Sequence, residues 1–404
     1  MKRFTVLLLA VALAPLARPQ SLFSDIPSIQ MGLASITGLE FTRAVPYALM
    51  NKDQLRRDFE QRIKASLKPD DLHAEEITLK LLGLVPADFD LRQNTIDLLT
   101  EQAAAFYDYN KKKLFVLDDA GNGVEEKVAL VHELAHALAD QHFRLAKFVQ
   151  EGLRSDDGAT ARMAVMEGQA SWLMAAYLNM QAGGEPDVPT AVLQIMTQSI
   201  QSSAAEYPVF SKAPLYIRES LTFPYLSGMQ FQNAVYEKLG RESFSEVFVH
   251  PPVSTHQIFH PETYLAHAAP VIPELPAAPG LKDFRKLGEG TLGELEYRVL
   301  LTQYGNAGDA DRTAAHLVGS SYAVLEDKRD KTPAIAFAAA WDSEDAARAY
   351  FEQYRGVLRG KWKTLEITSD SPSELSGRGD SGYFRMWLAG ATVNHLEGWK
   401  NPVH

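Results

Sequence analysis

The stretch Val131–Phe143 reads VHELAHALADQHF and contains the pattern H-E-x-x-H at His132, Glu133 and His136. Its other residues are mostly Ala and Leu, without Pro or Gly, which favours a helix. Two residues four apart on a helix lie about 40° from each other on one face. The two imidazoles can therefore bind one Zn²⁺ at about 2.0–2.1 Å each. Glu133 would then take a proton from a water molecule beside the metal and pass it to a leaving amine. The alternative is a buried helix with two core histidines and a solvated Glu.

A catalytic zinc ion usually has three protein ligands and a water molecule, and His142 is one candidate for the third ligand. It lies ten residues after His132, the spacing of the metzincin pattern H-E-x-x-H-x-x-G-x-x-H. That pattern needs Gly at its eighth position to break the helix, and Ala139 stands there instead. In a continued helix His142 is rotated about 80° the other way from His132. Its alternative role is to meet the negative end of the helix dipole.

Glu167 is the second candidate for the third ligand. It lies in ARMAVMEGQASWLM, inside a second helical pattern over residues 159–180. A lone carboxylate among Met, Ala, Val, Trp and Leu is costly to bury without a partner, and a metal cation would supply one. Two antiparallel helices joined by a loop over residues 152–158 would bring Glu167 against the histidines. The alternative is a Glu on the solvent face of its helix. We predict that His132, His136 and Glu167 bind one Zn²⁺.

With these motifs, the chain resembles a group of exported bacterial gluzincin metallopeptidases whose members carry H-E-x-T-H-A-L-Q-D-Q-H-F and E-G-x-A. The stretches AAFYDYNKKKLFV, FPYLSG and, at 251–264, PPVSTHQIFHPETY fit the same resemblance, which covers most of the chain after residue 85. It implies a zincin-like fold and zinc-dependent hydrolysis of peptide bonds. Two positions depart from the pattern. Ala135 stands where Thr is frequent, and Ser171 stands where thermolysin-like enzymes carry an acid that orients a histidine. Asp140 is the candidate for that orienting role.

Peptide hydrolysis also needs a hydrogen-bond donor for the oxyanion that forms at the carbonyl. The chain offers Tyr225, His256, His260 and Tyr264 in the region after the second helix. The resemblance favours Tyr225 and His260 as catalytic residues, although a structural role is an equally good alternative for each. FPYLSG, with its Pro in second place, is expected to open a helix that runs to Leu239.

The first twenty residues have the composition of a secretory signal peptide: a basic start, a short apolar run and small residues before Gln20. The apolar run is too short to span a membrane, and no later segment is apolar enough. There is no Cys, which excludes a lipid anchor on an N-terminal Cys and any disulfide. We therefore predict a secreted or periplasmic protein without an integral membrane segment after removal of the signal.

The composition is that of an ordinary globular protein, with 46% hydrophobic and 23% charged residues. A formal net charge of −11 argues against nucleic acid or anionic membranes as principal partners. We expect a peptide or protein substrate instead. Neither the specificity nor the oligomeric state can be derived from these patterns.

The predicted fold class is α+β: a mostly helical zincin-like metallopeptidase domain with a small edge hairpin, and a C-terminal α+β domain with an antiparallel sheet. The hairpin, over 105–118, would hold an extended substrate by β-augmentation or merely cover the core. Its polar turn is N-K-K. After the signal peptide at 1–20, the predicted organisation is an N-terminal helical region (21–105), a metallopeptidase core (106–267), a Pro/Ala-rich linker (268–280) and the C-terminal domain (281–404).

The C-terminal domain is expected to contain helices over 292–304, 312–317 and 343–355 and strands over 321–325, 334–341, 383–388 and 391–396. It contains no cluster of ligands or nucleophiles, so a chain ending near Gly280 is expected to keep its metal. Two classes of function follow for the whole chain. The first is an exported zinc metallopeptidase with Glu133 as general base. The alternative is a catalytically silent zincin-fold binding or assembly protein of the cell envelope. The intact Glu133 favours the enzyme.

Overall fold

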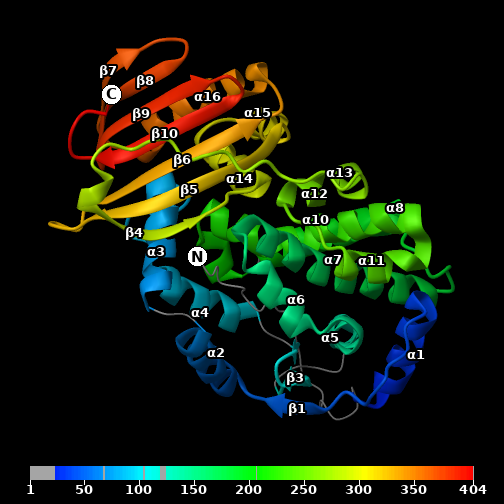
Figure 1. The fold of residues 1–404 in the computed structure, drawn as a ribbon. Coiled ribbons are helices and arrows are strands. Elements are labelled where there is room, and N and C mark those ends of the chain that lie inside the picture. The colour runs from blue at the N-terminus through cyan, green and yellow to red at the C-terminus, as the bar shows by residue number, and fades with distance from the viewer. Residues whose placement is uncertain (1–22, 67–68, 103–104, 119–123, 206, 404) are drawn as a thin grey trace.

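The computed structural model describes residues 23–66, 69–102, 105–118, 124–205 and 207–403 (Figure 1). The predicted signal peptide lies outside these residues. Within them the protein is α+β, as predicted: helices dominate the first two thirds, and a large antiparallel sheet forms the last third. In this described part, no helix is both long enough and apolar enough to cross a membrane.

The N-terminal and central parts are mainly helical, with three short strands. Figure 1 shows α7 and α10 running side by side through the middle of the molecule, with α5 below them. The elements are α1 (Ile26–Thr37), β1 (Tyr47–Met50), α2 (Lys52–Ser66), α3 (Pro69–Leu82), α4 (Leu91–Gln102), β2 (Ala105–Asp108), β3 (Lys113–Leu117), α5 (Val124–Phe143), α6 (Leu145–Gly152), α7 (Asp156–Gln181), α8 (Thr190–Ala205), α9 (Pro208–Lys212), α10 (Leu215–Leu239), α11 (Ser243–Val249), α12 (Thr255–Phe259) and α13 (Pro261–Leu265).

The small sheet has the strand order β1-β3-β2. Strands β2 and β3 form the predicted hairpin, whose turn is fixed because the Asp108 carboxylate accepts the backbone N–H groups of Asn110 and Lys111. Strand β1 pairs with β3 in parallel and was not predicted, because this region reads as helical in the sequence. A parallel pair needs a long crossover, here made by α2, α3 and α4. Strand β2 is left at the edge of the sheet, against α5.

Helix α10 differs from the sequence prediction. Pro224 does not open the helix but lies inside it, because the helix already begins at Leu215. An interior Pro removes one backbone hydrogen bond and costs about 3 kcal/mol. The buried side chains on both sides of it, including Leu221 and Phe231, offset that cost by packing in the core. The apolar pattern before the Pro was therefore the better helix signal.

The C-terminal sheet has seven strands in the order β4-β5-β6-β10-β9-β8-β7, with every neighbouring pair antiparallel. Helix α16 packs on the central strands, with α14 beside it. The helix expected at 312–317 is displaced toward the N-terminus, because Asn306 caps it by accepting the Asp309 N–H. The elements are β4 (Phe284–Gly290), α14 (Glu294–Tyr304), α15 (Ala307–Ala314), β5 (Leu317–Asp327), β6 (Pro333–Trp341), α16 (Glu344–Lys361), β7 (Leu365–Asp370), β8 (Glu374–Gly379), β9 (Gly382–Ala389) and β10 (Thr392–Trp399).

The two parts of the chain share an interface. One apolar cluster contains Leu82 and Phe231 from the helical part and Leu300 and Phe337 from the C-terminal part. Backbone groups at the end of α3 also accept hydrogen bonds from the C-terminal part, such as that from the buried Lys361 Nζ to the carbonyl of Leu81 at 3.1 Å. Further bonds reach Gly83 from Gln303 and Tyr304. The predicted linker lies along the C-terminal sheet, where the Val271 N–H donates to the carbonyl of Val318.

This shared cluster changes the expectation for a chain ending at Gly280. Removing the C-terminal part exposes the apolar side chains on the other side of the interface, each worth about 1.5–3 kcal/mol when buried. We expect the shortened chain to aggregate or to lose its near-ultraviolet circular dichroism. Residues 281–404 supplied as a separate chain should restore solubility, since the interface and not the covalent connection is required. A shortened chain that is monomeric and unfolds cooperatively by itself would contradict this expectation.

Candidate metal centre

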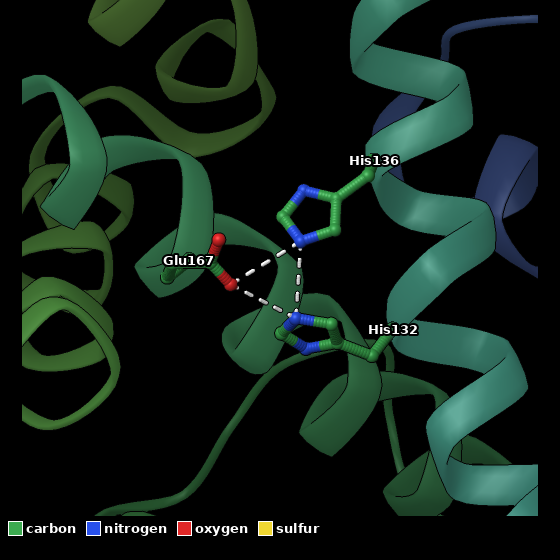
Figure 2. Close-up of side chains that lie close together, drawn as sticks. All are labelled: His132, His136 and Glu167. Atoms are coloured by element: carbon green, nitrogen blue, oxygen red, sulfur yellow. Dashed lines mark hydrogen bonds and ion pairs between the residues drawn. The ribbon is translucent and has the colours of Figure 1, made fainter. Parts of the chain in front are cut away.

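The three predicted ligands meet between α5 and α7 (Figure 2). Glu167 Oε2 lies 3.1 Å from His132 Nε2 and 3.3 Å from His136 Nε2. The two Nε2 atoms lie 3.1 Å apart. All three side chains are buried, and Figure 2 shows the carboxylate of α7 pointing at both rings of α5. This His-His-Glu group can hold a metal ion.

The spacing and chemistry of these donors fit a zinc ion. Ligand atoms at 2.0–2.1 Å from a tetrahedral metal are separated by about 3.3–3.4 Å, close to the 3.1–3.3 Å found here. Burial lowers the pKa of His132, whereas for His136 burial is outweighed by the negative charge of Glu167, which raises the pKa of that ring. Burial would raise the pKa of Glu167, but the two imidazoles outweigh it and hold that pKa at about 2. The site thus offers an ionised carboxylate and imidazole nitrogen, a donor set typical of zinc.

Helix α5 has no break at Ala139 and continues through His142 to Phe143. Its regular geometry puts the rings of His132 and His136 edge to face, with centroids 4.7 Å apart. His142 lies away from this group, and its Nε2–H donates to the carbonyl of Glu40 at 2.8 Å. The fold therefore brings Glu167, and not His142, to His132 and His136, which differs from the ligand set of the metzincin pattern.

Two glycines allow α7 and α10 to touch through their backbones. A Cβ atom added to Gly168 would lie 2.1 Å from the carbonyl carbon of Gly228, and one added to Gly228 would lie 2.2 Å from the carbonyl oxygen of Ala164. The E-G-x-A and F-P-Y-L-S-G motifs thus meet at these glycines. This contact brings Tyr225 to the candidate centre, where its ring stacks on that of His132 with centroids 5.9 Å apart.

The Tyr225 hydroxyl is buried and has no hydrogen-bond partner among the described residues. Burial raises its pKa well above 10, and the negative charges of Glu167 and Glu133 raise it further. The phenol therefore keeps its proton at any physiological pH. It is a hydrogen-bond donor beside the predicted ligands.

Glu133 lies on α5 next to the first ligand, and its two oxygens have different surroundings. Oε2 accepts the backbone N–H of Tyr107, on strand β2, at 2.6 Å. Oε1 is buried and has no hydrogen-bond partner among the described residues. Burial raises the pKa of Glu133 to about 8, and Glu167 adds to this while His136 and the Tyr107 N–H oppose it. One oxygen is thus fixed by the edge strand, and the other is left to exchange a proton.

Asp140 does not orient a ligating histidine, contrary to the prediction. Its Oδ2 accepts the Tyr107 hydroxyl at 3.0 Å, and its Oδ1 accepts the Leu145 N–H at 3.0 Å. Lys112 and Arg43 lie 3.5 Å and 3.7 Å from Oδ2. Asp140 therefore ties strand β2 to helix α5, and so fixes the N–H group that holds Glu133. No local sequence pattern indicates this contact, because Tyr107 and Asp140 are far apart in the chain.

His260 is not brought to the candidate centre. Its Nε2 lies 3.1 Å from Glu294 Oε2, in a separate group with His256. The structure therefore gives no support for a catalytic role of His260 in the chemistry at His132 and Glu167. Glu294 was not singled out from the sequence. The sequence feature that could have drawn attention to Glu294 is its spacing of four residues from Arg298. Residues four apart on a helix lie on the same face, so the two side chains can pair.

Comparisons with protein-family models, with curated proteins and with solved structures find no match.

The contact between α7 and α10 can be tested by substituting Gly168 with Ala. The added methyl group would meet the backbone of Gly228, which cannot move like a flexible side chain. We expect a loss of about 1–3 kcal/mol in the free energy of unfolding, measured by chemical denaturation, together with weaker metal binding. Gly308→Ala is the matched control, because its nearest atom would lie at 3.4 Å and Ala favours a helix over Gly. Equal stability of the two variants would show that the close approach is not required.

Proposed function

We propose that the protein is an exported zinc metallopeptidase. In this proposal His132, His136 and Glu167 hold one Zn²⁺, Glu133 is the general base, and Tyr225 donates a hydrogen bond to the oxyanion. The observation that carries the proposal is the unpartnered Oε1 of Glu133, buried beside a group that can hold a metal. A binding protein would need the ligands but not this carboxylate. Buried polar atoms without a partner are rare and often mark a reacting site.

The zinc ion, when bound, would lower the pKa of water and polarise a carbonyl oxygen. Glu133 takes up the proton released as the hydroxyl group of water bonds to the carbonyl carbon. The Tyr107 N–H holds Oε2, so the proton goes to Oε1. When the C–N bond breaks, Glu133 returns this proton to the leaving nitrogen, and the products are a carboxylic acid and an amine.

Tyr225 contributes at the carbonyl oxygen. As the carbonyl carbon becomes tetrahedral, negative charge grows on that oxygen, and a donor already in place lowers the barrier. The Tyr225 hydroxyl is protonated and buried, and the Glu167 carboxylate is close enough to act on its proton. Its ring is held by stacking on His132, which keeps the hydroxyl near the ligands.

The edge strand β2 favours an extended peptide as the substrate. The N–H and C=O groups of one residue in an antiparallel pair point to the same side. Because the Tyr107 N–H points to Glu133 and not to β3, its carbonyl also lies on the free edge. A substrate backbone could add to this edge by β-augmentation and place a peptide bond beside Glu133.

Export is proposed from the signal-like composition of residues 1–20. The gluzincin resemblance, carried by HELAHALADQHF and EGQA, supports the same function. No contact in the described residues specifically favours the alternative of a catalytically silent binding protein.

The ligand set predicts the metal content of three variants. His136→Ala should lower the zinc content from about one ion per chain to nearly none, measured by elemental analysis after dialysis. His142→Ala is the matched control on the same helix and should keep its zinc, because the His142 ring donates to the Glu40 carbonyl and is not part of the His-His-Glu group. If Glu167→Gln keeps full affinity while His142→Ala loses it, this ligand set is wrong.

The role of Glu133 is tested by its change to Gln. The amide keeps the size of the side chain and an oxygen for the Tyr107 N–H, but it cannot take up a proton. We expect zinc to remain bound and kcat on a cleaved peptide, found by screening a peptide library, to fall by about 10²–10⁴ or more. Comparable turnover at equal zinc content would remove Glu133 from the mechanism. An intact zinc site that cleaves no peptide even in the unaltered protein would favour the binding protein.

A further inference from the structure

We propose that His256, His260 and Glu294 form a second metal site, which binds Zn²⁺ and cross-links the helical part of the protein to its C-terminal part. The site is separate from the candidate catalytic centre. Its possible ligand atoms, one from each side chain, all lie within 4.8 Å of one another. His256 lies on α12, His260 follows the end of that helix, and Glu294 is the first residue of α14.

One carboxylate oxygen is the common point of the group. Glu294 Oε2 lies 2.7 Å from His256 Nδ1 and 3.1 Å from His260 Nε2. The two rings lie close together, with centroids 4.5 Å apart. His260 is no longer helical, with φ −126° and ψ 75°, and this lets it present Nε2 where His256 presents Nδ1. Two imidazole nitrogens and a carboxylate oxygen therefore converge, the same donor types as in the first group.

The other carboxylate oxygen is already held in place. Arg298 donates to Glu294 Oε1 from Nε at 2.7 Å and from Nη2 at 2.6 Å, and His260 Nε2 lies 3.2 Å from this Oε1 as well as 3.1 Å from Oε2. A carboxylate that binds a metal through one oxygen is commonly hydrogen-bonded through the other. On the far side of the second ring, His260 Nδ1 faces Glu262 Oε1 across 3.7 Å, as a carboxylate often does behind a ligating histidine.

The charges nearby are compatible with a cation despite the guanidinium. Arg298 also pairs with Asp311, at 2.8 Å from Nη1, so its positive charge is shared between two carboxylates. With neutral imidazoles, Glu294, Arg298 and Asp311 together carry one negative charge. A divalent cation would therefore enter a site with a net attraction for it.

The position of the group suits a structural cross-link that remains accessible to ions. The Glu294 side chain is fully buried, whereas those of His256 and His260 are 27% and 24% exposed. Solvent can thus supply the ion and a fourth ligand. The histidines precede the Pro/Ala-rich segment 268–280 and Glu294 follows it, so a metal would join the two parts directly.

The test is a Co²⁺ titration of the metal-free full-length protein, followed by visible absorption and equilibrium dialysis. We expect two equivalents to bind to the unaltered chain and one to the variant His132→Ala/His136→Ala, which lacks the first group. Adding His256→Ala to that variant should lower the Co²⁺ affinity of the remaining site by more than about 10–100-fold, which is the loss expected when a residue that only hydrogen-bonds to a metal ligand is removed. His316→Ala is the matched control, since its ring pairs with the Asp342 carboxylate at 2.7 Å but has no third donor.

Thermal unfolding gives an independent readout. Zn²⁺ should raise the melting temperature of His132→Ala/His136→Ala, and His256→Ala or His260→Ala should abolish that rise. One bound equivalent in the folded unaltered protein would overturn the proposal and leave a metal-free ion-pair group. A second equivalent that survives both His256→Ala and His260→Ala would also overturn it. Neither result depends on whether Glu133 acts as a base.

Discussion

The negative charge of Glu167 has to be compensated inside an apolar helix, and the helical part is arranged to do so. Glu167 is buried between Met166 and Gly168, in a helix whose other buried residues are mostly apolar. An isolated carboxylate in such surroundings would be protonated or would destabilise the fold by several kcal/mol. The two imidazoles of α5 compensate its charge and keep it ionised. The fixed distance between α5 and α7 follows from this requirement.

The same local patterns that reveal these residues in the sequence fail where the fold depends on distant pairs. His132 and His136 could be predicted because a helical period fixes their separation, and Glu167 because it is a lone carboxylate among apolar residues. Strand β1 could not be predicted, since its partner β3 lies beyond three helices. The prediction that the segment around Pro224 opens a helix was also wrong. Helix α10 continues through Pro224, where it packs on α7, and this packing is not visible in the local sequence.

In the candidate site, too, local patterns predict some residues correctly, whereas contacts between distant residues could not be predicted. The resemblance pointed to Tyr225 and His260, and the fold brings only Tyr225 to the ligands. Tyr225 is close because α7 and α10 approach through glycines, a contact that no residue spacing within one helix encodes. Asp140 was expected at a histidine, but it holds the Tyr107 hydroxyl instead. Its carboxylate thus acts on Glu133 through the edge strand and not through either histidine of the group.

The C-terminal part also fixes the helix that carries Glu167. The Tyr322 hydroxyl of the C-terminal part donates to Asp156 Oδ2 at 2.8 Å, and the Thr255 N–H, on α12 of the helical part, donates to Asp157 Oδ1 at 2.8 Å. Both carboxylates lie in the first turn of α7, where their negative charges also interact favourably with the positive end of the helix dipole. A Cβ on Gly293 would lie 1.8 Å from Asp157 Oδ1, so the chain entering α14 packs directly on this turn. Helix α14 in turn begins with Glu294, the carboxylate shared by His256 and His260. The C-terminal part therefore constrains both His-His-Glu groups. It supplies Glu294 to the group with His256 and His260, and it anchors the start of α7, which supplies Glu167 to the group with His132 and His136.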